Sequence, residues 1–290
     1  MIMQQWPEHV QRIVSLALEE DLGTGDITTN AIFSGSETGS AILVSREDGV
    51  LAGIGLAGFI QQVVSEDVRF ETALQDGDRL TPGMVIARLH GPLAPILSAE
   101  RTLLNFLQRM CGIASQTALY LQELESTGTR ILDTRKTAPG HRYLDKMAVQ
   151  VGGGTNHRMR LDDRFLIKEN HIRMAGGIAQ AIGLCSEYRE QRGLEAGIEI
   201  EVTTLDELQE VLDCGGVDYV MLDNMSLDAM REAVRRVGGR ILTEASGNVT
   251  LERLRDIAAT GVDFISSGAL THSVRAMDIS LLVDSRKTGS

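Results

Sequence analysis

Three short stretches between residues 133 and 171 combine basic side chains with glycines. They are Asp133-Thr-Arg-Lys-Thr-Ala-Pro-Gly, Gly152-Gly-Gly-Thr-Asn-His-Arg and Leu166-Ile-Lys-Glu-Asn-His. Arginine forks match carboxylates and phosphates, lysines supply point charges, and glycines let the backbone approach a ligand closely. These stretches predict a binding site for a small molecule with several negative charges. A solvated basic face explains any one of these residues equally well, but not the whole set.

Positive charge is concentrated in this part of the chain. Residues 130–175 hold ten Lys or Arg against five Asp or Glu, so the segment is +5 in a chain whose net charge is −12. The remainder is therefore −17. An acidic protein with one basic island favours a small polyanionic substrate and disfavours a general nucleic-acid or anionic-membrane surface.

The overall composition is typical of a globular protein. The 290 residues are 43% apolar and 23% charged, which indicates about two domains at roughly 150 residues each. The three cysteines form no C-x-x-C pair, so we expect neither a disulfide framework nor a zinc site. This cysteine usage fits a protein of the reducing cytoplasm. We expect no signal peptide, and the longest uncharged stretch, at 17 residues, is short for a membrane span of about 20.

The first 112 residues mix helix and strand signals. Residues 10–17 have helical apolar spacing, residues 40–44 and 68–72 have strand character, and residues 76–83 are rich in turn residues. This pattern predicts an N-terminal α+β domain, sandwich-like, over residues 1–112. A helix predicted over residues 98–117 leads into the second part.

From residue 113 the chain alternates aliphatic runs with helical patterns. The predicted strands are 130–133, 165–168, 198–202, 219–223, 241–244 and 264–266, and the predicted helices are 178–191, 205–212, 227–237 and 251–259. Repeated βα units form parallel sheets, and six strands are too few for a regular eight-stranded barrel. We expect an irregular, smaller-than-eight-stranded α/β barrel over residues 113–275, with residues 276–290 as a candidate return to the first domain.

Each aliphatic run ends in a residue capable of chemistry. The polar residues Glu201, Asp223, Glu244 and Ser266 are spaced 22, 21 and 22 apart. Because parallel strands deliver their carboxyl ends to one rim, these side chains should converge there with the basic residues. We expect the active site at this rim.

Taken together, these blocks resemble the quinolinate phosphoribosyltransferases, also called carboxylating nicotinate-nucleotide pyrophosphorylases. The resemblance rests first on Thr134-Arg-Lys-Thr and on the two His-containing stretches quoted above. It continues through Glu20-Asp-Leu-Gly-Thr-Gly-Asp, Ala99-Glu-Arg-Thr-Leu-Leu-Asn, Ile200-Glu-Val, Leu222-Asp-Asn, Glu244-Ala-Ser-Gly and Ser266-Ser-Gly. Several blocks in the expected order over nearly the whole chain are far more specific than one short motif.

The resemblance implies a reaction, a metal and an assembly. Phosphoribosyl pyrophosphate and quinolinate would give nicotinate mononucleotide, pyrophosphate and carbon dioxide, with Mg²⁺ and no organic cofactor, in the cytoplasm. It implies carboxylate ligands at Arg135, His157, Arg158 and Lys168, a further substrate contact at Thr134, and a catalytic Lys136 between the two substrates. It also implies a homodimer in which Arg101 reaches the neighbouring subunit's site, although without the resemblance an exposed helix face is the favoured explanation of Arg101.

The carboxylates at the strand ends need a separate argument. Glu199 and Glu201 alternate with aliphatic residues, so both point to one face of their strand, which in a barrel is the interior. A buried carboxylate is costly unless it is paired or binds a cation. Glu201 and Asp223, which the resemblance also marks as catalytic, are therefore candidates for Mg²⁺ or ribose hydroxyls. The alternative is an ion pair with a neighbouring Arg or Lys.

Two late loops are candidates for a phosphate cradle. Loops after late barrel strands bind phosphate through backbone N–H groups, which here indicates Ser246, Gly247 and Asn248, and Ser267 and Gly268. The resembling family usually has a second glycine where Asn248 stands. Asn is the substitute that best tolerates a positive φ, so we expect the cradle to be kept.

Three other functions compete with this one. Lys168 at a strand end is compatible with a Schiff-base barrel enzyme. Residues 53–58 match G-x-G-x-x-G, a dinucleotide motif, but a turn-rich stretch follows it in place of another βα unit. A paralogue acting on another aromatic acid, or a non-catalytic binder, differs from the favoured function only in the shape of the pocket.

Overall fold

The computed structural model describes residues 6–283 of the chain, which form two compact units. The first contains the chain up to Ala118, Ala138–Gly153 and the segment from Val274; the second contains Leu119–Thr137 and Gly154–Ser273. The domain boundaries drawn from the sequence, at residues 112 and 275, stay a prediction. The units differ from them chiefly at residues 138–153, whose helix packs within the first unit.

The first unit is built on a four-stranded antiparallel sheet with the order β12-β1-β5-β3. Its elements are α1 (Glu8–Leu22), α2 (Ile27–Ile32), β1 (Thr38–Ser45), β2 (Gly49–Val50), α3 (Ile54–Val64), β3 (Arg69–Glu71), β4 (Arg79–Leu80), β5 (Val85–Pro92), α4 (Leu93–Glu123), α5 (Arg142–Val151) and β12 (Ile279–Val283). Residues 119–123 of α4 belong to the second unit. Of the candidate returning segment, β12 pairs with β1, and residues 284–290 lie outside the described residues.

The glycine motif at residues 53–58 has a structural explanation in this unit. Gly53, with φ +91°, precedes α3, and the backbone N–H groups of Gly53 and Ile54 both donate to Asp76 Oδ1, at 2.8 and 3.0 Å. A Cβ at Gly58 would lie 3.3 Å from Phe70. The amides that a dinucleotide phosphate would need are therefore already bonded, and the motif serves helix capping and packing.

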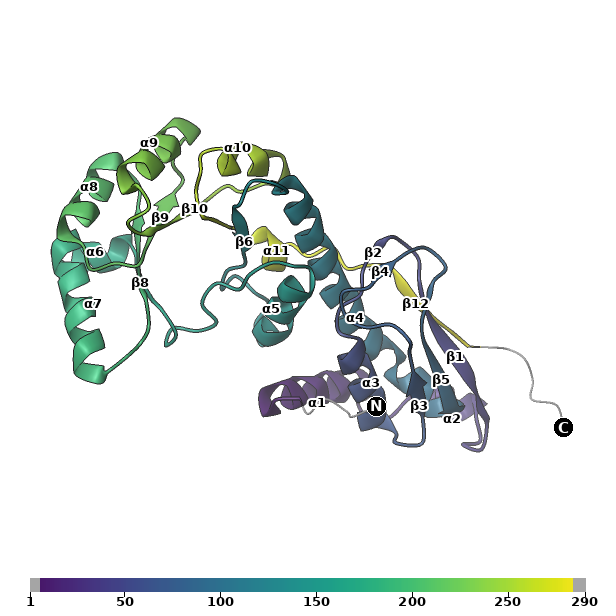
Figure 1. Ribbon diagram of the computed structural model, residues 1–290. Helices are drawn as coiled ribbons and strands as arrows, with labels where there is room; N and C mark the ends of the chain where they lie inside the picture. Colours follow the sequence, from purple (N-terminus) through teal and green to yellow (C-terminus); the bar gives the residue numbers. More distant parts are fainter. Residues whose placement is uncertain (1–5, 284–290) are drawn as a thin grey trace. The chain divides into compact units, whose positions relative to one another are not determined.

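The second unit contains a six-stranded parallel sheet with the order β6-β11-β10-β9-β8-β7. Its strands are β6 (Arg130–Leu132), β7 (Phe165–Ile167), β8 (Ile198–Val202), β9 (Tyr219–Asp223), β10 (Leu242–Ser246) and β11 (Phe264–Ser266). Its helices are α6 (Glu169–Ala175), α7 (Ile178–Arg192), α8 (Leu205–Cys214), α9 (Leu227–Val237), the 3₁₀ turn η1 (Leu251–Arg253), α10 (Leu254–Ala258) and α11 (Ala269–His272). Helices α7 to α10 form an arc along the outer face of the strands (Figure 1). The predicted small α/β barrel is confirmed, as is the separate α+β unit.

Over residues 6–283 the barrel is open, because its sheet has two edges rather than a closed ring of strands. Among the described residues β6 and β7 are its two edge strands, and Thr155 makes a single parallel bridge to Leu132 on the outer edge of β6. Several predicted boundaries were wrong in detail, and the helix predicted over residues 98–117 spans Leu93–Glu123. Strand β10 runs on to Ser246, and the helix predicted over 251–259 begins as a 3₁₀ turn. No helix within residues 6–283 is long and apolar enough to cross a membrane.

Strand β8 shows how the alternation of residue types builds the site. Ile198, Ile200 and Val202 are buried on one side of the strand, where the outer helices pack, while Glu199 and Glu201 point to the other side. Helix α8 then begins at a capping box, in which Thr204 accepts from the Glu207 N–H and the Glu207 side chain reaches back. Because β8 is short and α8 begins soon after it, the carboxyl end of β8 is left free for a functional side chain.

Candidate active site

A cleft of about 610 Å³ opens at the carboxyl ends of the parallel strands, entirely within the second unit. Eleven of the residues predicted from the sequence line it: Thr134, Arg135, Lys136, His157, Arg158, Lys168, Glu201, Asp223, Ser246, Gly247 and Asn248. The sequence spread these residues over 115 positions, and the parallel sheet brings them to one rim. Cations and carboxylates therefore share a single cavity.

Lys136 is placed by its loop rather than by a regular element. Its backbone N–H donates to Thr134 Oγ1 at 3.0 Å, and its carbonyl accepts from Thr271 Oγ1 at 2.9 Å. A Cβ on Gly268 would lie 2.9 Å from Lys136 Cδ, so only glycine leaves room for the lysine stem. The loop is thus fastened to the first turn after β11, and Lys136 lines the cleft.

Lys168 ends β7 beside Glu201 on β8. Lys168 Nζ donates to Glu201 Oε2 at 2.8 Å, and the lysine is half exposed. Burial, and then the nearby Glu201, raise the pKa of Asp223 on the next strand above its ordinary value. The ion pair that sequence analysis left open as an alternative for Glu201 is present. Imine-forming lysines are commonly activated by an apolar pocket or a neighbouring cation, whereas Lys168 contacts a carboxylate, which argues against a Schiff-base enzyme.

Arg158 and His157 lie on the loop that precedes β7. The Arg158 guanidinium donates to the carbonyl of Arg164 at 3.1 Å, and burial, then the neighbouring Arg135, lower its pKa below the ordinary value. The His157 ring is buried. Its Nδ1 accepts from the Arg158 backbone N–H at 2.7 Å, and its Nε2 lies 3.1 Å from Glu199.

The loop after β10 forms another wall of the cleft. Gly247 has φ +89° and Asn248 has φ +49°, a region that L side chains other than Asn and Asp avoid. Asn248 Nδ2 donates to Asn224 Oδ1 at 2.9 Å, and Asn224 Nδ2 donates to Asp223 Oδ2 at 2.8 Å. The expected substitution of Asn for glycine at a positive φ is observed, and it adds a hydrogen-bond chain from this loop to Asp223.

Three predicted residues do not line the cleft. Arg101 lies exposed on α4, in the first unit. The Ser267 backbone N–H donates to the Leu132 carbonyl at 3.0 Å, so this amide serves the sheet. Gly268 packs against Lys136, as described above. Of the second predicted loop, Ser266 rather than Ser267 reaches the cavity.

Five residues that line the cleft had been given no binding or catalytic role from the sequence: Leu166, Met221, Asn224, Glu244 and Ser266. A signal existed for three of them. Glu244 and Ser266 stand in the regular series of strand ends, and Asn224 follows Asp223 directly. Leu166 and Met221 lie inside aliphatic runs, where nothing in the sequence separates a cavity wall from the general core.

The fold and the cleft together define an α/β-barrel enzyme that binds small polyanionic substrates. Two family models match nearly the whole chain: the quinolinate phosphoribosyl transferase N-terminal domain over residues 26–111 and the C-terminal domain over residues 113–282. The chain belongs to the quinolinate phosphoribosyltransferase family, whose members are pentosyltransferases.

Individual relatives agree with this assignment. The carboxylating nicotinate-nucleotide pyrophosphorylase of Arabidopsis thaliana, described as chloroplastic, is 44% identical over 95% of this chain and 83% of its own length. The probable enzyme of the same name from Bacillus subtilis is 43% identical over 90% of this chain and 89% of its own. The solved nicotinate-nucleotide pyrophosphorylase of Francisella tularensis superposes with a TM-score of 0.90 at 37% identity, covering 97% of this chain and 99% of that one.

Proposed function

We propose that this protein transfers phosphoribosyl from phosphoribosyl pyrophosphate to the ring nitrogen of quinolinate, with loss of carbon dioxide and pyrophosphate, to give nicotinate mononucleotide for NAD biosynthesis. One observation supports this above all others: cationic side chains from three separate loops face two strand-end carboxylates across one cleft. The two substrates together carry two carboxylates, a phosphate and a pyrophosphate, and the cleft offers complementary charge to each.

The residues divide into two groups. Arg135, Arg158 and Lys168 would bind the carboxylates of quinolinate, since guanidinium forks and an ammonium match this geometry. The loop from Ser246 to Asn248 would hold the 5-phosphate of the ribose. Lys136, between the two groups, would contact both substrates and compensate the negative charge that collects on the departing pyrophosphate.

No nucleophilic side chain is needed for this reaction. The pyridine nitrogen attacks the anomeric carbon of the ribose as the bond to pyrophosphate breaks, so the protein contributes alignment and electrostatic stabilisation. Positive charge that develops at the anomeric carbon would be stabilised by the carboxylates of Glu201 and Asp223. Alkylation leaves a positive charge on the ring nitrogen, which stabilises the electron pair that stays on the adjacent ring carbon when its carboxylate leaves as carbon dioxide. A proton from water then replaces the carboxylate on that carbon. Basic residues then serve to orient that carboxylate out of water.

Glu201 and Asp223 are also the residues that fit Mg²⁺. Both offer carboxylate oxygens, the donors that this ion prefers, and burial and mutual repulsion already disfavour two ionised groups so close together. A divalent cation would relieve this repulsion. When bound, it would supply positive charge to the pyrophosphate that leaves.

The assembly and location are part of the same proposal. We infer a homodimer in which Arg101 of each subunit serves the other's cleft, because this arginine is exposed and is not among the residues that line the cleft of its own chain. We infer the cytoplasm from the cysteines: Cys111, Cys185 and Cys214 are all free thiols. The shared site can be tested by mixing Arg101→Ala protein with Lys136→Ala protein. In a mixed dimer one cleft keeps its own Lys136 and receives Arg101 from the other subunit, so partial activity should return.

Direct assay tests the function. Purified protein with phosphoribosyl pyrophosphate and Mg²⁺ should form nicotinate mononucleotide from quinolinate, and much less from nicotinate, which lacks the second carboxylate. Lys136→Ala and Arg158→Ala should each lower activity by orders of magnitude while the far-ultraviolet circular dichroism stays native. Equal use of nicotinate would indicate a paralogue with another acceptor, and near-normal turnover in both variants would reject the assignment.

A further inference from the structure

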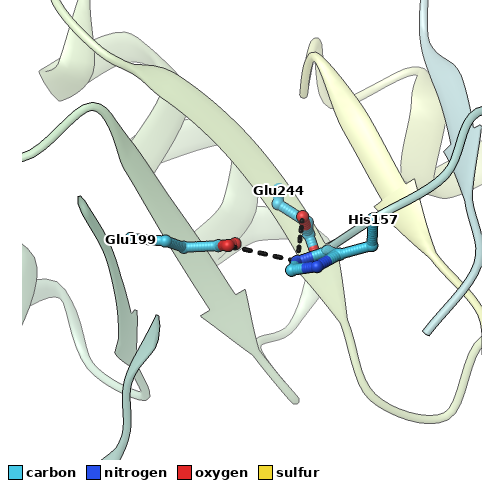
Figure 2. A group of neighbouring side chains, drawn as sticks. All are labelled: His157, Glu199 and Glu244. Atoms are coloured by element: carbon cyan, nitrogen blue, oxygen red, sulfur yellow. Dashed lines mark ion pairs between the residues drawn. The ribbon is translucent and has the colours of Figure 1, made fainter. Parts of the chain in front are cut away.

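Both ring nitrogens of His157 lie against other groups of the protein. Figure 2 shows the ring between the carboxylates of Glu199 and Glu244, with Nε2 at 3.1 Å from Glu199 Oε2 and 3.5 Å from Glu244 Oε2. On the other side, Nδ1 is 2.7 Å from the backbone nitrogen of Arg158. The imidazole is 6% exposed and both glutamate side chains are fully buried. This ring is therefore poorly placed to meet a substrate carboxylate directly.

The contact at Nδ1 determines the tautomer. A backbone N–H can only donate, so Nδ1 must present its lone pair. The proton of such an imidazole then sits on Nε2, the nitrogen that lies beside the two carboxylates. Arg164 supplies a further positive charge at 3.4 Å from Glu199.

This arrangement also distinguishes a protonated ring from a metal ligand. One nitrogen of His157 and one oxygen from each glutamate lie within 4.8 Å of one another, a grouping that resembles a cation site. A histidine that binds metal through Nε2 normally donates its Nδ1 proton to an acceptor. Here Nδ1 faces a donor, the backbone N–H of Arg158. Metal binding at Nε2 would move the ring proton to Nδ1, where it would repel that N–H.

We infer that Glu199 and Glu244 are positioning residues, which hold the Nε2–H form of His157 so that its Nδ1 fixes the backbone of Arg158 at the cleft. The inference rests on the proposed function only in taking Arg158 as a carboxylate ligand. It gives His157 a positioning role in place of the direct contact that the family resemblance implied.

The surroundings of Arg158 explain why such an anchor is useful. The His157 backbone N–H donates to Asp133 Oδ1 at 2.9 Å. His157 and Arg158 are therefore both held in place through their backbone nitrogens. Arg135 and Arg164 lie close enough to disfavour the charge on Arg158. Glu199 and Asp163 attract the same guanidinium, so it lies among opposing charges, and carboxylate binding needs the fork held in one orientation.

The tautomer can be tested on the wild-type protein without reference to activity. Long-range ¹H–¹⁵N spectra of uniformly ¹⁵N-labelled protein should show His157, assigned by its loss in His157→Asn, as a neutral ring protonated at Nε2. Addition of Mg²⁺ or Zn²⁺ should leave this pattern unchanged. An Nδ1–H pattern, or a shift of the ring signals with either metal, overturns the inference.

Two amide variants separate the two ring nitrogens. Asn at position 157 can place its Oδ1 where Nδ1 lies and keep an acceptor for the Arg158 N–H, whereas Gln places its amide at the Nε2 position and loses that acceptor. In calorimetry with quinolinate, His157→Asn should stay within about threefold of the wild-type Kd, and His157→Gln should weaken binding about tenfold, the effect of one hydrogen bond. Equal losses, or a greater loss in the Asn variant, would indicate direct substrate contact and overturn the inference.

The carboxylates are tested in the same assay. Glu244→Gln keeps an acceptor for the Nε2–H and should preserve binding, whereas Glu244→Leu should raise the Kd and KM for quinolinate and leave the KM for phosphoribosyl pyrophosphate unchanged. Equal rises in both KM values would indicate general damage to the fold and contradict the inference. If the wild-type protein binds no quinolinate, the proposed function fails, while the ring spectrum still decides the tautomer.

Discussion

Lys168 Nζ lies 2.8 Å from Glu201 Oε2, so the cation proposed to bind quinolinate is paired with the carboxylate proposed to serve the ribose and Mg²⁺. The two residues follow from the pairing of β7 with β8, in which Ile167 lies opposite Ile200. Lys168 and Glu201 each follow one member of this pair directly, which brings them side by side. The ion pair keeps the lysine stem over the cleft and links the two halves of the proposed site before substrates arrive.

Replacing Lys168 should affect activity far more than stability. Half-exposed ion pairs contribute about 0–1 kcal/mol, so Lys168→Ala should change the free energy of unfolding by no more than that. Loss of one charge-assisted hydrogen bond to substrate should lower kcat/KM for quinolinate about 10- to 100-fold. Urea denaturation and steady-state kinetics measure the two effects. A large loss of stability with unchanged kcat/KM would make the pair a purely structural contact.

A methyl group at residue 268 should displace Lys136. The added Cβ would lie 2.9 Å from both Lys136 Cδ and His272 Cδ2, so Gly268→Ala should lower kcat by at least about tenfold. Gly183→Ala is the matched control, because the exposed glycine of α7 has no neighbour within 4 Å of a new Cβ. The control should be fully active and slightly more stable, by up to about 1 kcal/mol. Equal activity in the two variants would contradict the placement of Lys136.

Asn248 combines a backbone role with a hydrogen bond, and two variants separate them. Asn248→Gly keeps the positive φ, whereas Asn248→Ala should lose roughly 1 kcal/mol of stability to left-handed strain. Both lose the hydrogen bond to Asn224, so both should raise the KM for phosphoribosyl pyrophosphate about two- to tenfold. Thermal denaturation and donor kinetics provide the readouts. An unchanged donor KM in both variants would show that the chain to Asp223 has no part in binding.

Glu244 should make stability depend on pH. Burial, and then the neighbouring Glu199, raise the pKa of Glu244 well above its ordinary 4.5. A raised carboxyl pKa in the folded state means that the contribution to stability is present below pH 4.5 and is lost as pH rises through the folded value. Glu244→Gln holds this group neutral, so the variant should gain stability relative to wild type over that range.

Urea denaturation at a series of pH values checks this expectation. The curves of wild type and Glu244→Gln should diverge as pH rises and then run parallel above the folded pKa. Glu190→Gln, on the exposed side of α7, controls for the removal of a surface charge. Curves that stay parallel throughout would mean that Glu244 is ionised as easily as a glutamate in water.

Local patterns predicted most regular elements of the second unit because each depends on neighbouring residues. Alternation of aliphatic and polar residues marked β8, and the polar residue after each run marked the rim. The boundaries that differed have local causes. Strand β10 continues through Glu244 and Ala245 because both are buried beside β9 and β11, a fact of sheet pairing that residue type alone does not reveal.

The sequence by itself determined the class of ligand, since charge type and glycine spacing survive any arrangement of the chain. It also identified most of the cleft, because parallel strands must deliver their ends to one rim. Only the tertiary structure decided which groups contact one another: that Lys168 pairs with Glu201, that Ser267 gives its amide to the sheet, and that His157 faces two buried glutamates. Those contacts depend on distances of a few ångströms between strands far apart in the chain, and no local pattern encodes such distances.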